Sequence, residues 1–175
     1  ILVGEMRDHQ TIQVALQAAL TGHLVLASLH TIDTTQTLQR MLSYFPEHLR
    51  AQVAMDLALC LVGVVSQRLV PRSDEGRVVA VEVLSSGPSV QKLLREQRIE
   101  ELQDLMRGSK DPGLTTFNRS LLRLFRDGEI DYEVGLAYSS NPEEFALHAE
   151  GMATGVATFR AESGEAGEMD MKALL

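Results

Sequence analysis

Two short apolar segments near the start of the chain flank one amphipathic helix, and this arrangement constrains the fold most. Residues 1–3 are apolar, Ile12 and Leu16 share one face of a helical pattern over residues 10–20, and residues 24–29 are apolar without polar alternation. Uninterrupted apolar strands are typical of parallel sheets that are covered on both faces. A strand, a helix and a strand in about 30 residues make a βαβ unit. The sequence therefore predicts an α/β fold.

The next segments extend this α/β part. Thr31 or Asp33 is expected to cap a helix that ends near Phe45. Apolar residues at helical spacing predict one long helix over residues 47–66. Two short strands are then expected around a polar turn, at residues 68–70 and 78–84. These elements place the first domain at residues 1–87.

From Pro88 onward the pattern is helical and predicts a second, smaller domain over residues 88–149. Its expected helices cover residues 89–95, 99–107, 115–127, 131–138 and 142–149. Residues 150–175 are rich in Gly, Ala, Ser, Thr and Glu and show no apolar period, so this tail is expected to be disordered.

Charge and cysteine content exclude several classes of protein. The net charge is −8, with most of the acidic excess after residue 138, and this argues against nucleic acid as a partner because phosphate binding needs clustered Lys and Arg. The single cysteine, Cys60, excludes an internal disulfide and fits a reducing cytosol. The apolar run over residues 57–65 is too short to span a bilayer, which takes about 20 apolar residues.

The chain begins without Met and at full strand hydrophobicity. Native domains seldom begin inside their core, so the sequence is interpreted as a fragment of a longer protein. No Gly-rich phosphate loop of the pattern GxxxxGK[ST] occurs in the 175 residues.

Two polar side chains follow the two expected parallel strands. Glu5 comes after the first strand and His30 ends the second, so both are expected at the sheet edge where α/β proteins bind ligands. A carboxylate there can hold a Mg²⁺-bound water or orient an attacking water, and an imidazole can stabilise a terminal phosphate. His23 lies at the other end of the second strand, about 23 Å away for seven extended residues, so it cannot share one site with His30 within a subunit.

Residues 1–8 and 22–31 make this interpretation specific. Residues 1–8 resemble the Walker B segment of secretion ATPases, and residues 22–31 resemble the His box of the same family. The resemblance continues in order to about residue 149. It includes Arg40 with Phe45–Pro46, the segment Ser66–Pro71, Val81–Val83 with Gly87–Pro88, and the stretch from Gly113 to Ile130, which resembles the terminal helical domain of type IV pilus retraction ATPases.

The resemblance implies the C-terminal half of a RecA-like ATPase domain followed by a small helical domain. It implies a cytoplasmic homo-hexamer, peripheral to the inner membrane at the pilus base, that binds ATP and Mg²⁺ and powers pilus retraction against an inner-membrane platform protein. Glu5 would be the Walker B acid and a tentative Mg²⁺ ligand through water, and His30 would face the γ-phosphate. Gly4, Arg7, His23 and Arg40 would lie near the nucleotide or between subunits. The 175 residues alone would be inactive because they lack the Walker A loop.

Two departures from the family pattern leave alternatives open. Retraction motors carry an Ala-Ile-Arg-Asn-Leu-Ile-like helix where this chain has residues 89–95 without that Arg and Asn, which favours a PilU-like accessory branch that works beside a principal retraction ATPase. After His30–Thr31 the family usually has small residues, whereas this chain has residues Asp33–Gln36. The alternative function is a non-catalytic or accessory ring subunit that keeps the fold.

Overall fold

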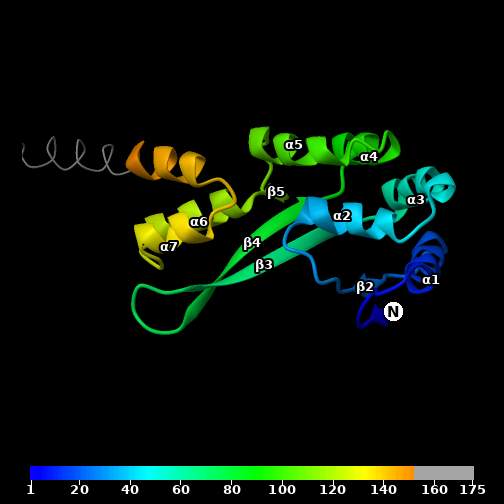
Figure 1. Cartoon of the computed structure of the whole chain (residues 1–175), viewed down its shortest axis with the longest axis horizontal. Helices are drawn as coiled ribbons and strands as arrows, with labels where there is room; N and C mark the ends of the chain where they lie inside the picture. Colours follow the sequence, from blue (N-terminus) through cyan, green and yellow to red (C-terminus); the bar gives the residue numbers. More distant parts are fainter. Residues whose placement is uncertain (152–175) are drawn as a thin grey trace, which may run out of the picture. The chain divides into compact units, whose positions relative to one another are not determined.

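A computed structural model describes residues 1–151, and Figure 1 shows its elements. These residues form two compact units. The first unit contains Ile1–Leu69 and Val79–Phe117, and the second contains Val70–Val78 and the chain from Asn118 onward. The predicted disordered tail lies outside the described residues, except for its first two positions, which are helical. Among the described residues, no helix is both long and apolar enough to cross a membrane.

The first unit opens with the predicted βαβ unit. Strand β1 (Leu2–Val3) pairs in parallel with β2 (Leu26–Ala27), with Leu2 opposite Leu26. Helix α1 (His9–Leu20) connects them and begins at Asp8, whose carboxylate accepts a hydrogen bond from the amide of Thr11 at 2.8 Å. The mixed helix and sheet architecture agrees with the predicted α/β fold.

The parallel strands differ from the prediction in length and burial. The second strand covers two residues rather than the whole run 24–29. Leu2 and Leu26 are 79% and 58% exposed, and Ile1 and Leu24 are exposed as well. The prediction that both faces of these strands are buried is therefore wrong for the described residues, in which α1 packs through Ile12 and Leu16 while these strand side chains stay accessible.

Helices α2 (Thr34–Ser43) and α3 (Glu47–Cys60) build most of the core of the first unit. Asp33 rather than Thr31 caps α2, because its side chain accepts a hydrogen bond from the amide of Gln36 at 2.7 Å. The core side chains from these helices are Leu38, Met41, Leu42, Val53, Ala54, Leu57 and Ala58.

The predicted helix over residues 47–66 is wrong after Cys60. Strand β3 (Gly63–Pro71) begins three residues later. Val62, Val64 and Val65 favour extended backbone because they branch at Cβ. Gly63 also lies against its neighbouring strand, since a Cβ on it would be 3.1 Å from the carbonyl oxygen of Leu84.

Strand β3 belongs to a three-stranded sheet of order β3–β4–β5, in which β4 is Arg77–Ser85 and β5 is Leu114–Thr115. Strand β4 pairs antiparallel with β5, with Leu84 opposite Leu114. Alternate residues of β4, at positions 80, 82 and 84, are fully buried.

Three short helical segments follow β4. They are α4 (Pro88–Arg95), the 3₁₀ turn η1 (Ile99–Glu101) and α5 (Leu102–Gly108). Their side chains Val90, Leu94, Ile99, Leu102 and Met106 share one core with α2 and α3. These segments therefore belong to the first compact unit, and the predicted domain boundary after residue 87 stays a prediction.

The second unit is built around Phe145, which is fully buried. It contains α6 (Phe117–Arg126) from Asn118 onward, α7 (Tyr132–Tyr138) and a helix over residues 142–151. The ring of Phe145 contacts those of Phe125 and Tyr132, with centroids 6.2 and 6.0 Å away. Asn118 is buried and joins these helices, because its Nδ2 donates to the carbonyl oxygen of Asn141 at 2.7 Å and its Oδ1 accepts from the amide of Ser140 at 2.9 Å.

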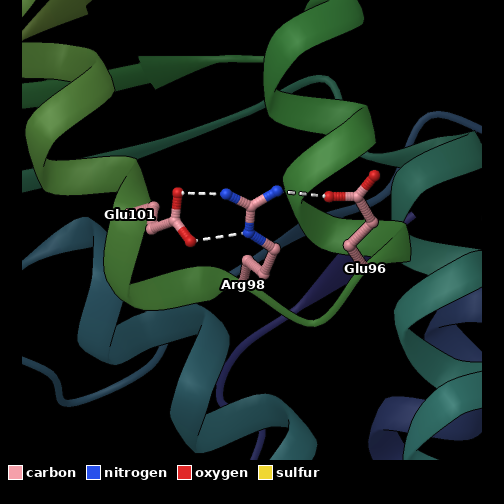
Figure 2. A network of polar contacts seen from close by, with 3 residues as sticks. All are labelled: Glu96, Arg98 and Glu101. Carbon is pink, nitrogen blue, oxygen red and sulfur yellow. Dashed lines mark hydrogen bonds and ion pairs between the residues drawn. The ribbon is translucent and has the colours of Figure 1, made fainter.

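Charged side chains form a network at the turn that follows α4 (Figure 2). Arg98 donates to both carboxylate oxygens of Glu101 at 2.6 Å and contacts Glu96 at 2.7 Å. Before it, Gln97 has a φ of 55°, in the left-handed region. The amides of Gln97 and Arg98 bond back to the carbonyl oxygens of Leu94 and Leu93 at 3.0 and 2.9 Å, which is a Schellman cap.

Replacing Gln97 with Gly should stabilise the protein. Left-handed backbone costs a residue with a Cβ about 1 kcal/mol, and Gly avoids this cost. Gly128, with a φ of 75°, makes the same cap after α6 and provides the reverse substitution. In denaturant unfolding we expect Gln97→Gly to gain about 1 kcal/mol and Gly128→Gln to lose about 1 kcal/mol. A loss of stability in Gln97→Gly would show that the backbone at residue 97 is not left-handed.

Candidate functional site

Hydrogen bonds tie together the segments that follow β1 and β2. The amide of Met6 donates to the carbonyl oxygen of Ser28 at 3.0 Å, and the hydroxyl of Ser28 donates to the carbonyl oxygen of Gly4. Because β1 and β2 are parallel, both segments leave the sheet at the same edge. Gly4 therefore helps to join the two segments through its carbonyl oxygen, and Glu5, the next residue, lies at the same edge of the sheet.

Glu5 and His30 meet at this edge. Nε2 of His30 lies 3.2 Å from Oε1 of Glu5, and Arg7 contacts the other carboxylate oxygen, Oε2. The side chain of Glu5 is 24% exposed and that of His30 is 84% exposed. The structure thus brings three of the predicted site residues together, and it leaves an accessible imidazole beside a largely covered carboxylate.

Arg7 lowers the pKa of this carboxylate, chiefly through its hydrogen bond. The hydrogen bond from Arg7 holds the pKa of Glu5 below its ordinary value of 4.5, and the charge of Arg7 and proximity of His30 act in the same direction. Glu5 in turn raises the pKa of Arg7. A carboxylate with a lowered pKa accepts protons poorly, so this geometry suits orienting a water or a metal-bound water better than general base catalysis.

His23 and Arg40 make their contacts elsewhere in the first unit. Nδ1 of His23 lies 3.2 Å from the carbonyl oxygen of Ala18 at the end of α1. Nε of Arg40 donates to the hydroxyl of Tyr44 at 3.3 Å, and the guanidinium lies over the same ring. As expected, His23 is not part of the Glu5–His30 pair, although β2 is limited to Leu26–Ala27 and does not extend to His23.

The side chains at the edge fit a magnesium–phosphate ligand better than a metal ion held by protein alone. Within residues 1–151, no group of three or more His, Cys, Asp or Glu side chains could hold a metal ion. Mg²⁺ commonly binds one or two carboxylates and completes its shell with waters and substrate phosphates. One ionised carboxylate beside an imidazole and a guanidinium matches that pattern, with Glu5 as the residue that would hold the ion or its water.

Sequence reasoning missed two polar residues, Ser28 at this edge and Glu82 in β4. The hydroxyl of Ser28 links the two segments at this edge by its hydrogen bond to the carbonyl oxygen of Gly4. Glu82 is 1% exposed and bonds to the start of α2, four residues after His30. Its signal was available in the sequence, since Glu82 falls between Ala80 and Leu84 at an inward-facing position of an alternating strand.

The sequence matches a family of secretion system proteins. The model of the family described as "Type II/IV secretion system protein" matches residues 1–123. The type IV pilus ATPase PilU of Pseudomonas aeruginosa is 40% identical over 148 residues, which cover 84% of this chain and 39% of that protein. The twitching motility protein of Neisseria gonorrhoeae is 38% identical over 148 residues, which cover 84% of this chain and 40% of that protein.

A solved structure supports the same relation. The crystal structure of the pilus retraction motor PilT with bound ADP matches with a TM-score of 0.74 and 38% identity, covering 82% of this chain and 40% of that one. This chain thus spans less than half the length of these relatives.

Proposed function

Since the chain belongs to the family of type II/IV secretion system proteins, we propose that it is part of an ATPase motor that powers type IV pilus retraction. The observation that carries this proposal is the contact of Glu5 with His30 at the carboxyl end of two parallel strands, in a chain similar to pilus retraction ATPases. The phosphate-binding loop comes from sequence outside these 175 residues, which contain no GxxxxGK[ST] pattern.

In this motor the edge residues orient the reacting groups of ATP. Glu5 holds the attacking water or a metal-bound water, and Arg7 keeps the carboxylate ionised. His30, whose imidazole is open to solvent, donates a hydrogen bond to the terminal phosphate. Glu5 would hold Mg²⁺ through a water, and the ion would neutralise negative charge on the phosphates. His23 and Arg40 act between subunits of a homo-hexamer at the cytoplasmic side of the inner membrane, against a pilus platform protein.

The 175 residues alone should not turn over ATP, because the phosphate cradle and its Lys are absent from them. Magnesium-dependent phosphate release from the purified 175-residue chain, above that of a Glu5→Gln chain, would contradict this.

A more specific proposal is that the protein belongs to the PilU-like accessory branch of retraction ATPases. In α4, Val90 and Leu94 are buried and Lys92 is exposed. The helix therefore keeps its packing face, while Gln91 and Lys92 replace the Arg and Asn of the family pattern. Neither offers the planar, bidentate donor of Arg. We propose that the protein hydrolyses ATP but drives full retraction only beside a principal motor.

A genetic experiment tests the motor and its direction. Deleting the gene in its host should reduce twitching motility while pili remain on the cell surface, because a retraction motor is not needed to assemble them. Loss of surface pili would indicate an assembly motor, and unchanged motility would contradict the proposed function.

Supplying the gene as the only retraction ATPase should restore motility incompletely, and full restoration would contradict the accessory role.

A further inference from the structure

The first unit buries one carboxylate, Glu82, in the face of β4 that packs on the core. Ala80 and Leu84 occupy the neighbouring inward positions and are fully buried, as is Glu82 itself at 1% exposure. Burying a carboxylate is unfavourable unless hydrogen bonds replace its water. The groups that bond to Glu82 therefore show what it holds in place.

Both carboxylate oxygens of Glu82 accept hydrogen bonds. Oε1 accepts from the amide and hydroxyl of Thr34, at 2.9 and 2.8 Å, and from Nε2 of Gln103 at 3.4 Å. Oε2 accepts from the amide of Phe117 at 3.4 Å. The two shortest bonds go to Thr34, the first residue of α2, whose amide has no partner within the helix. Glu82 thus fixes the start of α2.

The start of α2 also fixes the segment that carries His30. Only three residues separate His30 from Thr34, and the hydroxyls of Thr31 and Thr37 are 2.7 Å apart. The imidazole of His30 is mostly exposed and contacts Glu5. Its position therefore depends on the backbone of residues 30–34 rather than on packing around the ring.

We propose that Glu82 is a positioning residue that holds His30 at the sheet edge through its bonds to Thr34. The inference rests on the proposed ATPase function and adds a buried residue to its site. Losing these bonds lets the start of α2 shift, which moves His30 away from the phosphate while leaving the rest of the nucleotide site in place. Hydrolysis should then fall more than nucleotide binding.

Three variants of the full-length assembled protein separate this role from a general loss of stability. Glu82→Leu removes the acceptor, Thr34→Val removes only the hydroxyl donor, and Glu82→Gln keeps an oxygen that can still accept from Thr34. We expect kcat to fall about 10- to 100-fold in Glu82→Leu and less in Thr34→Val, because a misplacement near 1 Å costs up to about 100-fold. The Kd for ATP should stay within about twofold, and Glu82→Gln should retain most of the activity.

The decisive measurement repeats Thr34→Val and Glu82→Leu in a His30→Ala background. If Glu82 acts through His30, neither substitution lowers kcat further there. An equal fall in both backgrounds, or an unchanged kcat with His30 present, overturns the proposal. Thr34→Val keeps the test decisive if Glu82→Leu does not fold. Gly128→Gln, which lowers stability in the second unit, is the matched control and should leave kcat unchanged.

The same experiment distinguishes a failure of the proposed Glu5–His30 site from a failure of the positioning role of Glu82. If His30→Ala alone leaves hydrolysis at its normal rate, then the proposed Glu5–His30 site fails and the positioning role fails with it. If His30→Ala lowers hydrolysis but the effects of Thr34→Val and Glu82→Leu add to it, only the positioning role of Glu82 is wrong.

Discussion

In the full-length protein, Glu5→Gln should reduce ATP hydrolysis by at least about 100-fold, the scale of losing one oriented acid–base or electrostatic group. Gln keeps the shape of the side chain but loses the charge that orients water or metal. It also loses the ion pair with Arg7 and the charged partner of His30. Nucleotide binding and assembly should be preserved, because the phosphate cradle lies elsewhere. Phosphate release and ATP binding, measured on the same preparation, check this.

Glu75 provides the matched control for this substitution. It is an exposed carboxylate in the turn between β3 and β4 and belongs to the second unit, so Glu75→Gln makes the same chemical change at a residue outside the proposed site. It should leave hydrolysis within about twofold, as expected of a surface change. Near-normal turnover in Glu5→Gln would mean that Glu5 is an ordinary loop carboxylate.

Gly135→Ala should destabilise the second unit by about 2 kcal/mol, the middle of the range for overpacking a core. A Cβ at this position would lie 2.1 Å from Cζ of Phe145 and 2.8 Å from its two Cε atoms. That ring is fully buried against Phe125 and Tyr132 and cannot move without disturbing both. Ala favours helix over Gly by about 1 kcal/mol, which offsets part of the loss. Thermal and denaturant unfolding measure the difference.

Gly108 tests the interpretation with the same change in another helix. It ends α5, and nothing lies within 4 Å of a Cβ placed there. Gly108→Ala should therefore be neutral or stabilising by up to about 1 kcal/mol. Equal stability of Gly135→Ala and the parent protein would show that Phe145 does not pack against α7 as described.

The local pattern of the sequence predicted much of the fold. The βαβ unit, the start of α2 at one of its two expected caps, and most helices of the second half agree with the structure within a few residues. It also predicted that Glu5 and His30 would share one sheet edge, since this follows from the parallel pairing of β1 and β2. Their chemical roles stay predictions.

What the sequence could not predict depends on contacts between distant residues. The end of α3 at Cys60 was missed because residues 61–66 continue an apolar helical period, and the approach of Gly63 to Leu84 becomes visible only in the sheet. The need for Gly at position 135 comes from Phe145, ten residues later. The inward position of Glu82 follows from the alternation of β4, but its hydrogen-bond partners could not be predicted, because they lie 21 to 48 residues away in the chain.

The place of the terminal phosphate tests the central claim most directly. A structure of the full-length protein with Mg²⁺ and a non-hydrolysable ATP analogue should show that phosphate at the carboxyl edge of β1 and β2. Nε2 of His30 should lie within hydrogen-bonding distance of it, and the carboxylate of Glu5 should bind the ion or a water beside it. A nucleotide bound with its phosphates away from this edge, with Glu5 still contacted only by Arg7 and His30, would contradict the account.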